Sequence, residues 1–507
     1  MNLMMLLEMA AGGFGDRVAV GSLKRGLTVQ QLFEYAGNAA LRFRNAGVEN
    51  IAMVDVMSPA LPICLFGASW AGLPFIPINY RLADNELYSL IKRVSPSIAL
   101  MEEETKIRIP KDSDVTIITK NEVLNETEKT LTLASDWEMD GEDIAVLLFT
   151  SGTTGEAKAA MLRHRHLVSY ILGSVEFMSA DENEAALISV PPYHIAGIAA
   201  TVSNLYAGRR IVQLPQFEAK AWVNLVRSES VTSAMVVPTM LSRIVEYLVS
   251  EGPNSEGLPS LRSLSYGGGR MPRPTIETAL KILPDTNFVN AYGLTETSST
   301  VALLGPEEHR EAISGSDENI RKRISSVGRP LPTLEVSIRN DLGKEVPQGD
   351  NGEIWVRGEQ VSGEYQGLEI RLDDNGWFPT NDGGWLDEEG YLFVTGRIDD
   401  VIIKGGQNIS PGEIEEVLLQ QESVSDAAAI GLPDQHWGEK IIATVVVFES
   451  SEVSEEDLKE VVKTALRSNR TPDTIVFVDE LPYNETGKLL RRVLRENLSH
   501  LGDAFTA

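Results

Sequence analysis

The chain has 507 residues, of which 43% are hydrophobic and 23% charged, and its 45 Lys and Arg against 73 Asp and Glu give a net charge of −28. This length exceeds what one hydrophobic core accommodates, so several folded units are expected. The negative charge opposes nonspecific binding to nucleic acid or to anionic membranes, so neither is a predicted partner.

An acidic protein that binds anions needs local clusters of basic residues. The sequence offers three such clusters: Arg163-His164-Arg165-His166, Arg467 with Arg470, and Lys488 with Arg491 and Arg492. Each is a candidate contact for a phosphate or a carboxylate.

The single cysteine and the N-terminus indicate the compartment. Cys64 cannot form an intrachain disulfide and lies in the apolar run 61–66, where core packing is its expected role. Residues 1–8 lack the basic start and cleavage site of a signal peptide, and no apolar run approaches the ~20 residues of a membrane span. We therefore expect a cytoplasmic protein without an integral membrane segment.

Strand and helix patterns alternate along most of the first four hundred residues. Thr28 and Gln31 form a capping-box signature, and apolar residues then recur at helical spacing until Gly47. Ser58-Pro59 opens another helix. Short apolar runs predict strands at 51–57, 75–78, 185–190, 210–214, 234–237 and 287–290. This alternation predicts an α/β fold with mainly parallel sheets.

The pattern changes after residue 327. Short alternating runs at 335–339 and 353–357 predict a small antiparallel or barrel-like subdomain over 327–398. Past Asp400 the α/β pattern returns, with an N-cap at Ser410-Pro411, strands at 427–430, 441–448 and 474–478, and a helix over 458–466. We therefore predict a large N-terminal domain, 1–398, and a small C-terminal domain, 399–507.

One polar loop stands out in the N-terminal part. It follows the apolar run 144–148 and reads Thr150-Ser151-Gly152-Thr153-Thr154-Gly155-Glu156-Ala157-Lys158. Backbone N–H groups and hydroxyls of such a loop hydrogen-bond phosphate oxygens, and a lysine helps neutralise them. The spacing differs from the mononucleotide P-loop, because no glycine directly precedes Lys158 and no Ser or Thr follows it. A polyphosphate is the expected ligand.

Four further motifs carry side chains suited to a nucleotide. They are Asn290-Ala291-Tyr292-Gly293-Leu294-Thr295-Glu296-Thr297, Trp377-Phe378-Pro379-Thr380-Asn381-Asp382, Gly396-Arg397-Ile398-Asp399-Asp400 and Asn484-Glu485-Thr486-Gly487-Lys488. Each alone is a weak signal, but their order and spacing together are specific. With the loop at 150–158, they make essentially the whole chain resemble the adenylate-forming superfamily of acyl-CoA synthetases, nonribosomal-peptide adenylation domains and luciferases, most of all a bacterial fatty-acid or aryl-acid CoA ligase.

The resemblance implies an enzyme that joins a carboxylic acid to AMP from ATP and then passes the acyl group to a thiol. ATP, Mg²⁺ and coenzyme A are its implied cofactors. The β- and γ-phosphates would lie at Thr150, Ser151, Gly152, Thr153, Thr154 and Gly155, with Lys158 assisting. The adenine would stack on Tyr292, beside Gly267, Gly268, Gly269, Asn290, Ala291 and Gly293.

The remaining groups of the nucleotide are assigned in the same way. Thr295 would contact the α-phosphate, and Glu296 would hold Mg²⁺. Asp382 and Arg397 would bind the ribose. The alternative is that both residues have only structural roles. Tyr292 would then be a core residue, and Glu296 would be an acidic residue at the start of a helix.

His194 matches the family histidine beside the carboxylate and acyl site, with an ordinary core histidine as the alternative. The other histidines show no metal-ligand spacing: His164, His166, His309, His436 and His500. Mg²⁺ carried with ATP is therefore the one expected metal.

The sequence departs from the family pattern at three places. Ala157-Lys158-Ala159 replaces the usual Pro-Lys-Gly, and alanine restricts the backbone more than glycine. Asn381 replaces the glycine before Asp382, but asparagine tolerates a left-handed backbone better than most residues. Gly383-Gly384 after Asp382 is also unusual.

The resemblance also implies two half-reactions. Lys488 would bridge carboxylate and phosphate while the acyl-adenylate forms. The C-terminal domain would then swing about a hinge at Asp399, which brings Lys404, Gly405 and Gly406 in to line the channel for the pantetheine of coenzyme A.

An acyl-CoA synthetase is the leading interpretation, because the chain ends shortly after Lys488 without an appended carrier domain. A stand-alone adenylation enzyme that loads a carrier protein is the runner-up, and a nucleotide-binding pseudoenzyme is the alternative from another class. Small residues at Ala196, Gly197, Ala199, Ala200, Ser298, Ser299 and Thr300 favour an apolar acyl or aryl substrate. The identity of the acid and the oligomeric state, a homodimer included, stay open.

Overall fold

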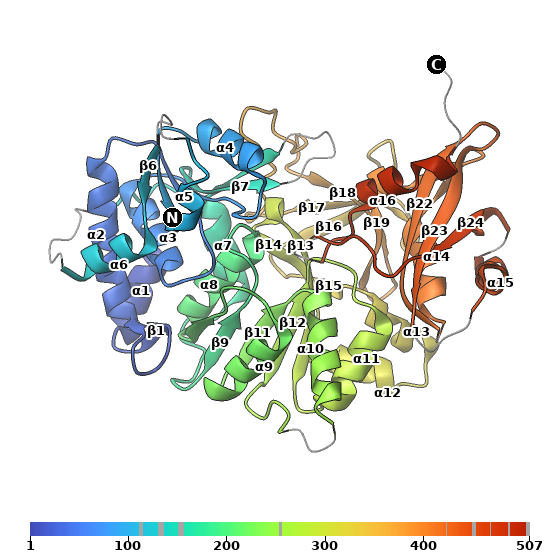
Figure 1. The fold of residues 1–507 in the computed structure, drawn as a ribbon, viewed down its shortest axis with the longest axis horizontal. Helices are drawn as coiled ribbons and strands as arrows, with labels where there is room; N and C mark the ends of the chain where they lie inside the picture. The colour runs from blue at the N-terminus through green and yellow to red at the C-terminus, as the bar shows by residue number, and fades with distance from the viewer. Residues whose placement is uncertain are drawn as a thin grey trace.

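The computed structural model describes residues 1–110, 115–129, 136–150, 157–252, 256–421, 423–448, 453–466, 468–484 and 487–502. Within these ranges the chain forms four sheets. Two large, mainly parallel sheets and one small antiparallel sheet belong to the N-terminal part, and a fourth sheet belongs to the C-terminal part (Figure 1). The predicted α/β fold with a smaller C-terminal domain is confirmed.

The first sheet has the order β6-β5-β3-β4-β7-β8. Its strands are β3 (Asn50–Val54), β4 (Phe75–Pro77), β5 (Ser97–Met101), β6 (Val115–Ile118), β7 (Ile144–Thr150) and β8 (Lys158–Arg163). The helices of this region are α1 (Met4–Phe14), α2 (Val29–Asn45), α3 (Ala60–Ala71), α4 (Asp84–Arg93), α5 (Glu103–Lys106) and α6 (Lys120–Lys129). All neighbours pair in parallel except β7 and β8, which form a hairpin.

The second sheet has the order β15-β14-β13-β12-β11-β9-β10-β1-β2. Its strands are β1 (Val18–Val20), β2 (Leu27–Thr28), β9 (Ala185–Ile188), β10 (Arg210–Gln213), β11 (Ser233–Val236), β12 (Ser263–Gly267), β13 (Asn287–Leu294), β14 (Ser299–Leu304) and β15 (Arg329–Pro330). The associated helices are α7 (His164–Ser174), α8 (Ile195–Ala207), α9 (Ala219–Ser228), α10 (Pro238–Ser250), α11 (Arg273–Ile282), α12 (Pro306–Ser314), α13 (Glu318–Lys322), η1 (Thr295–Thr297) and η2 (Arg323–Ser325).

The third sheet is the antiparallel one expected after residue 327. It consists of β16 (Glu335–Arg339), β17 (Gly352–Arg357), β18 (Phe378–Leu386) and β19 (Leu392–Arg397), in that order. The short helix η3 (Ile398–Asp400) leads from it to the C-terminal part.

The C-terminal sheet contains β20 (Ile402–Lys404), β21 (Gln407–Ile409), β22 (Val424–Asp434), β23 (Gly438–Val447) and β24 (Thr474–Phe477). Its helices are α14 (Pro411–Leu419), α15 (Glu455–Leu466), α16 (Arg491–Asn497), η4 (Ser468–Arg470) and η5 (Ser499–Leu501). Alternate residues of β22 feed two separate hydrophobic clusters, Ala427 and Ala429 on one face, Ala428 and Ile430 on the other. This part therefore has cores of its own, and it lies to one side of the N-terminal part (Figure 1).

Local sequence signals account for most element starts. Thr28 caps α2, and its hydroxyl accepts from the Gln31 backbone as the capping box predicts. Cys64 is fully buried, and burial raises the pKa of its thiol to about 12. Ser410 is at the N-cap of α14 and Pro411 begins the helix, as predicted, but the Ser410 hydroxyl donates to the carbonyl of Thr395 on β19 at 2.8 Å and makes no capping hydrogen bond. Among the described residues, no helix combines the length and apolarity needed to cross a membrane.

The basic cluster at 163–166 is not an open anion site, contrary to the prediction. Arg163 pairs with Glu364 at 2.6 Å, and Arg165 pairs with Glu142. His164 and His166 are buried, and burial lowers their pKa values to about 4 and about 3, so both are neutral at pH 7. The two arginine charges of this cluster are therefore paired within the protein, and the two histidines carry no charge at pH 7.

Buried neutral histidines make the protein less stable in acid. Below the ordinary histidine pKa of 6.5 the unfolded chain binds a proton that the folded chain refuses until about pH 3 at His166. Stability therefore falls as pH drops below 6.5, by about 2 kcal/mol for this residue at pH 5. In urea unfolding, His166→Asn should reduce the loss between pH 7 and pH 5 by that amount, since Asn can still accept from the Arg163 amide. His436→Asn, at an exposed position, is the control; an equal loss in both variants would contradict the burial effect.

Candidate functional site

Three neighbouring parallel strands, β11, β12 and β13, end at the same edge of the second sheet. Thr239 lies in the first turn of α10, just after β11; Gly267–Gly269 lie at the end of β12, and Ala291–Tyr292 lie in the second half of β13. The carboxyl ends of parallel strands are the place where α/β sheets bind ligands. Gly267 pairs with Ala291, and a Cβ at 267 would lie 2.2 Å from the Ala291 carbonyl oxygen. Only glycine permits this approach, so the predicted adenine-binding segments lie side by side. Next to Ala291, the Asn290 side chain donates a hydrogen bond to the Ser326 carbonyl oxygen at 3.1 Å, which ties β13 to the segment around Ser326.

Tyr292, Asp382 and Arg397 form one hydrogen-bonded group. The Tyr292 hydroxyl donates to Asp382 Oδ2 at 2.6 Å, and Arg397 Nη1 donates to Asp382 Oδ1 at 3.1 Å. The pairing of β18 with β19 sets Asp382 opposite Arg397, and Asp382 is only 7% exposed. Burial and then the Asp382 charge raise the pKa of Tyr292 well above its ordinary value, so it stays a donor. The structure thus assembles three of the predicted nucleotide contacts from distant segments.

The turn before Asp382 is left-handed. Asn381 has a φ of 59°, and its side-chain oxygen accepts from Arg371 at 3.1 Å. The asparagine therefore keeps the backbone that a glycine would give, as the sequence indicated. At Gly384 a Cβ would lie 2.5 Å from the carbonyl oxygen of Phe393, so the glycine lets β18 and β19 approach at their bulge.

Glu296 lies on η1, next to Thr295 at the tip of the β13–β14 hairpin, and is 9% exposed. The Tyr365 hydroxyl donates to Glu296 Oε1, and the Ser362 amide donates to the Glu296 carbonyl at 2.8 Å. Gln360 Nε2 donates to the carbonyls of Thr297 and Thr300. These contacts fix the tip, where Gly293 pairs with Thr300.

The segment 358–366 was missed by the sequence analysis. It also pairs with the second hairpin, because Gln366 N donates to Ala159 O and Met161 N donates to Glu364 O. It thereby joins the phosphate-loop hairpin to the Glu296 hairpin. Its irregular backbone has neither strand nor helix periodicity, so the one available signal was its cluster of polar residues with Gly363 and Tyr365.

The predicted phosphate loop connects β7 to β8. Thr150 and Lys158 are opposite each other at its two ends, and the Thr150 hydroxyl lies 3.4 Å from the Lys158 carbonyl. Ser151, Gly152, Thr153, Thr154 and Gly155 lie outside the described residues. Ala159 is fully buried within β8 and pairs with Phe149, so it occupies an extended position that needs no glycine.

The loop that carries Lys488 docks on this edge of the second sheet. A Cβ on Gly269 would lie 3.1 Å from the Gly487 carbonyl oxygen, and a Cβ on Gly487 would lie 2.9 Å from the Thr239 hydroxyl. Figure 1 shows this segment running from the C-terminal part toward the start of α10. Lys488 itself is exposed, and within the described ranges its ammonium group has no hydrogen bond or ion pair.

The Lys404–Gly406 loop, in contrast, contacts the C-terminal part. Lys404 Nζ binds both carboxylate oxygens of Asp473 at 2.7 Å, and Gly405 N donates to Trp437 O. Asp399 lies in η3, between the two parts. The structure therefore brings the Gly487–Lys488 loop, but not the Lys404–Gly406 loop, to the edge of the predicted nucleotide site.

His194 precedes α8 and packs against the ring of Tyr193, with centroids 4.7 Å apart. Burial lowers the pKa of His194 to about 4, so its imidazole is neutral at pH 7. The small residues proposed for the acyl group lie on α8 and at β14, which contact each other. Thr300 on β14 is 3.4 Å from the Tyr170 hydroxyl.

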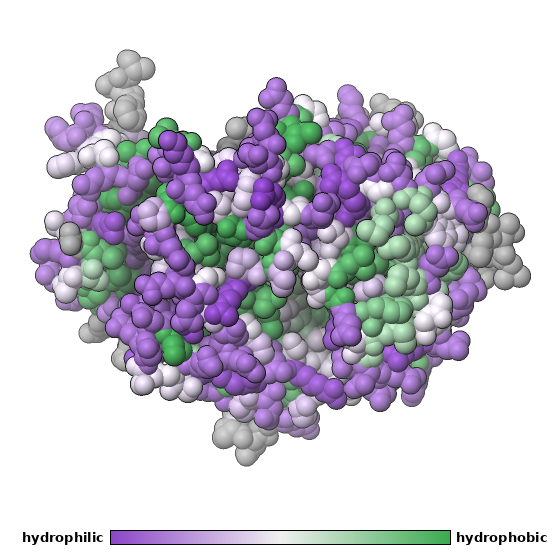
Figure 2. Space-filling model, turned by 180° about the vertical axis from the view of Figure 1, so that it is seen from behind, coloured by the Kyte–Doolittle hydropathy of each residue, from purple (hydrophilic) through white to green (hydrophobic). Residues whose placement is uncertain are grey.

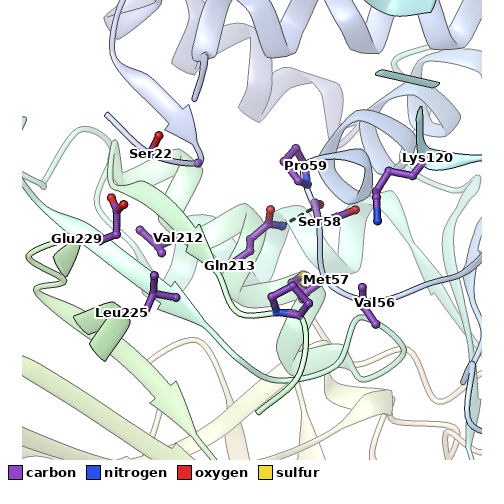
Figure 3. Close-up of a pocket in the computed structure, with 12 residues that line it drawn as sticks. Ser22, Val56, Met57, Ser58, Pro59, Lys120, Val212, Gln213, Leu225 and Glu229 are labelled. Atoms are coloured by element: carbon purple, nitrogen blue, oxygen red, sulfur yellow. Dashed lines mark hydrogen bonds between the residues drawn. The ribbon is translucent and has the colours of Figure 1, made fainter. Parts of the chain in front are cut away.

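A separate cavity of about 290 Å³ has Met57 in its wall (Figure 3). Gln213 donates to the Ser58 carbonyl on its wall, and Lys120 reaches in from the opposite side (Figure 3). No predicted nucleotide contact lines it. The Met57 methyl carbon is 3.3 Å from where a Cβ on Gly197 would lie, so one side chain separates this cavity from the first turn of α8.

The donor set suits Mg²⁺ better than a tightly held metal. Among the described residues, no group of three or more His, Cys, Asp or Glu side chains could hold a metal ion. Glu296 offers one carboxylate. Its Oε1 accepts a hydrogen bond from Tyr365, and its Oε2 has no hydrogen-bond partner among the described residues. Mg²⁺ typically binds one or two carboxylates together with substrate phosphates, so this residue fits it.

Comparison with known proteins agrees with this geometry. Residues 7–366 match the family described as AMP-binding enzyme, and residues 413–488 match its C-terminal domain. The chain is 31% identical to the fatty acid–[acyl-carrier-protein] ligase ScoC of Streptomyces coeruleorubidus, over 93% of this chain and 92% of that protein. It is 30% identical to a 2-succinylbenzoate–CoA ligase of Bacillus cereus, over 95% of this chain and 96% of that protein.

Solved structures show the same fold. ATP-bound MatB from Rhodopseudomonas palustris superposes with a TM-score of 0.87 at 25% identity, covering 99% of this chain and all of that chain. The apo form of the same protein, at the same identity and coverage, gives 0.78. Over the whole chain, the structure is therefore more similar to the ATP-bound form.

Asp382→Asn tests the polar group around Tyr292. The change removes the ion pair with Arg397 and replaces one acceptor by an amide donor, so AMP should bind about 10- to 100-fold more weakly, the range for a lost hydrogen bond to a charged group. Calorimetric titration with AMP measures it. Asp374→Asn, at an exposed position in the preceding loop, is the matched control; equal affinities for the two variants would refute the assignment of Asp382.

Proposed function

The chain belongs to the AMP-binding enzyme family, and from that premise we propose that it is an AMP-forming acid–thiol ligase. It activates a carboxylic acid with ATP, releases pyrophosphate, and transfers the acyl group from the acyl-adenylate to coenzyme A. The observation that carries the proposal is the docking of the Gly487–Lys488 loop on Gly269 and Thr239, beside Tyr292 and Asp382.

This docking supports a division of roles in the first half-reaction. Tyr292 offers a face to adenine, while Asp382 and Arg397 present acceptor and donor to the ribose hydroxyls. Lys488, whose ammonium group has no partner among the described residues, stabilises the charge on the α-phosphate as the carboxylate attacks. His194, neutral at pH 7, adds no charge beside the acyl group. The enzyme mainly positions the reactants and stabilises charge.

Mg²⁺ is the proposed metal, and Glu296 is the residue that would hold it. When bound, the ion neutralises the charge of the substrate phosphates. Tyr365 orients the Glu296 carboxylate, while Thr150, Lys158 and the residues between them are the proposed contacts of the β- and γ-phosphates. Thr295 neighbours Glu296 and is the proposed contact of the α-phosphate.

The second half-reaction requires a different orientation of the C-terminal domain. We place its boundary after residue 398 and its hinge at Asp399, because the strands from 402 onward form their own sheet with their own hydrophobic clusters. Rotation there would withdraw Lys488 and bring Lys404, Gly405 and Gly406 to the site as the coenzyme A channel.

Coenzyme A is the proposed acceptor. The 2-succinylbenzoate relative is named as a CoA ligase, whereas ScoC is named as a ligase for acyl-carrier protein. The net charge of −28 would repel an acidic carrier protein, which favours coenzyme A. A carrier protein is therefore the second candidate, supported by the identity to ScoC. ATP and coenzyme A as substrates support a cytoplasmic location.

A pyrophosphate-release screen tests the function. The acids should be of graded chain length and aromaticity, each with and without coenzyme A or a carrier protein. The small residues on α8 and β14 favour an apolar acyl or aryl acid. We expect pyrophosphate release with at least one such acid and a thioester with coenzyme A; absence of release with every acid would overturn the proposal, and preference for a dicarboxylate would overturn the apolar pocket.

Lys488→Ala should separate the two half-reactions. Adenylate formation should fall by about 10²- to 10³-fold, the cost of deleting one charge-stabilising donor. Thioester formation from presynthesised acyl-adenylate should stay close to that of the unmodified enzyme, because Lys488 leaves the site before that step. Single-turnover rates of each step measure the split, and equal losses in both would refute the role given to Lys488.

A further inference from the structure

Arg270 directly follows the Gly267–Gly269 segment, yet its guanidinium contacts the C-terminal part. Nη1 donates to the carbonyl of Gly412 at 3.0 Å, and the same side chain lies 3.8 Å from Glu415 and 3.7 Å from Glu416. Gly412, Glu415 and Glu416 all belong to the first turns of α14. One N-terminal cation therefore binds three groups of one C-terminal helix.

The start of α14 is pressed closely onto the N-terminal part. A Cβ on Gly412 would lie 2.6 Å from the Thr395 carbonyl oxygen, which also accepts from the Ser410 hydroxyl. This approach and the docking of Gly487 on Gly269 both join the C-terminal part to the N-terminal part. The contacts of Arg270 and the docked lysine loop therefore occur in the same orientation of the two parts.

The ion cluster continues to the residue after the proposed hinge. Glu415 Oε1 accepts from Arg491 at 2.5 Å and from the Ala429 amide at 2.8 Å. Arg491 and Arg495 of α16 in turn pair with Asp400. Asp400 is thus fixed to the C-terminal part, which leaves Asp399 as the adjoining point of rotation.

This arrangement allows the domains to separate at low cost. The Glu415 side chain is 7% exposed, and a buried carboxylate without a partner would be strongly destabilising. Arg491 belongs to the same domain and stays with Glu415 when Arg270 is withdrawn. Undocking therefore breaks the Arg270 contacts without leaving the Glu415 charge unpaired.

We propose that Arg270 is a positioning residue that holds the C-terminal domain in the adenylate-forming orientation through Gly412, Glu415 and Glu416. The role in catalysis rests on the proposed function, but the effect on orientation does not. Arg270 is 43% exposed, so its ion pairs are weak, whereas its charged hydrogen bond to a carbonyl is stronger. Together they should change the ratio of docked to undocked enzyme about 5- to 10-fold.

The distance between the two parts tests the proposal directly. Spin labels on cysteines introduced at Lys281 of α11 and Arg492 of α16, both exposed, report the orientation, while the natural Cys64 is fully buried and stays unlabelled. Arg270→Ala should lower the ratio of docked to undocked enzyme about 5- to 10-fold in the ATP-bound enzyme. Glu416→Lys places a second cation opposite Arg270 on the C-terminal side. This variant should change the ratio in the same direction.

Arg273→Ala is the matched control. Arg273 lies three residues further along, is 38% exposed, and pairs within α11 with Glu277. Its removal should leave the distance distribution unchanged. Arg270→Ala should also slow adenylate formation 5- to 10-fold, with AMP affinity and thioester formation from presynthesised acyl-adenylate unchanged, a split that general destabilisation would not give.

The outcomes separate the two proposals. An unchanged docked population in Arg270→Ala, or an equal fall in Arg273→Ala, overturns the positioning role whatever the activity. Loss of AMP affinity in Arg270→Ala also overturns it, since the side chain would then contact the nucleotide. Absence of pyrophosphate release by the unmodified enzyme, with a lower docked population in Arg270→Ala, overturns the proposed function alone.

Discussion

The backbone contact between Gly487 and the edge formed by Gly269 and Thr239 is the constraint on which the site depends. It joins a loop near the end of the chain to strands of the second sheet, across two parts with separate cores. A side chain on either glycine would force its neighbour to shift. The contact is therefore close but small, which suits the proposed movement of the C-terminal domain. Figure 2 shows the rear face of this assembly, where hydrophilic residues dominate and hydrophobic ones gather toward the middle.

The nucleotide edge is a buried polar group whose members satisfy one another. Asp382 would be costly to bury alone, but Tyr292 and Arg397 both donate to it. Glu296 is likewise held by Tyr365. Each carboxylate therefore has a donor within the protein and a fixed backbone. The segment 358–366 is central here, because it binds both hairpins that carry the proposed phosphate contacts.

The sequence predicted the elements whose signals are local. The capping box at Thr28, the strand before Tyr292, and the left-handed turn at Asn381 follow from side-chain and backbone preferences over a few residues. The sequence did not predict the strand that ends at Gly267. It did not predict contacts that the tertiary fold creates. The sequence predicts a helix cap at Ser410, but its hydroxyl bonds across the interface. In the cluster at 163–166 the two arginines pair with carboxylates and the two histidines are buried. Tyr365 and Arg270 carried no periodic or motif signal, since their partners lie 69 residues away at Glu296 and 142 away at Gly412.

We propose that this structure shows one of two orientations between which the C-terminal domain alternates. The spin-label distance between positions 281 and 492 in the otherwise unmodified enzyme tests it most directly, measured first with ATP and then with a non-reactive acyl-adenylate analogue and coenzyme A. With ATP, we expect one narrow distance between the two labels, equal to that in the present structure. With the analogue and coenzyme A bound, we expect a second, distinct distance. A single unchanged distance under both conditions would contradict it.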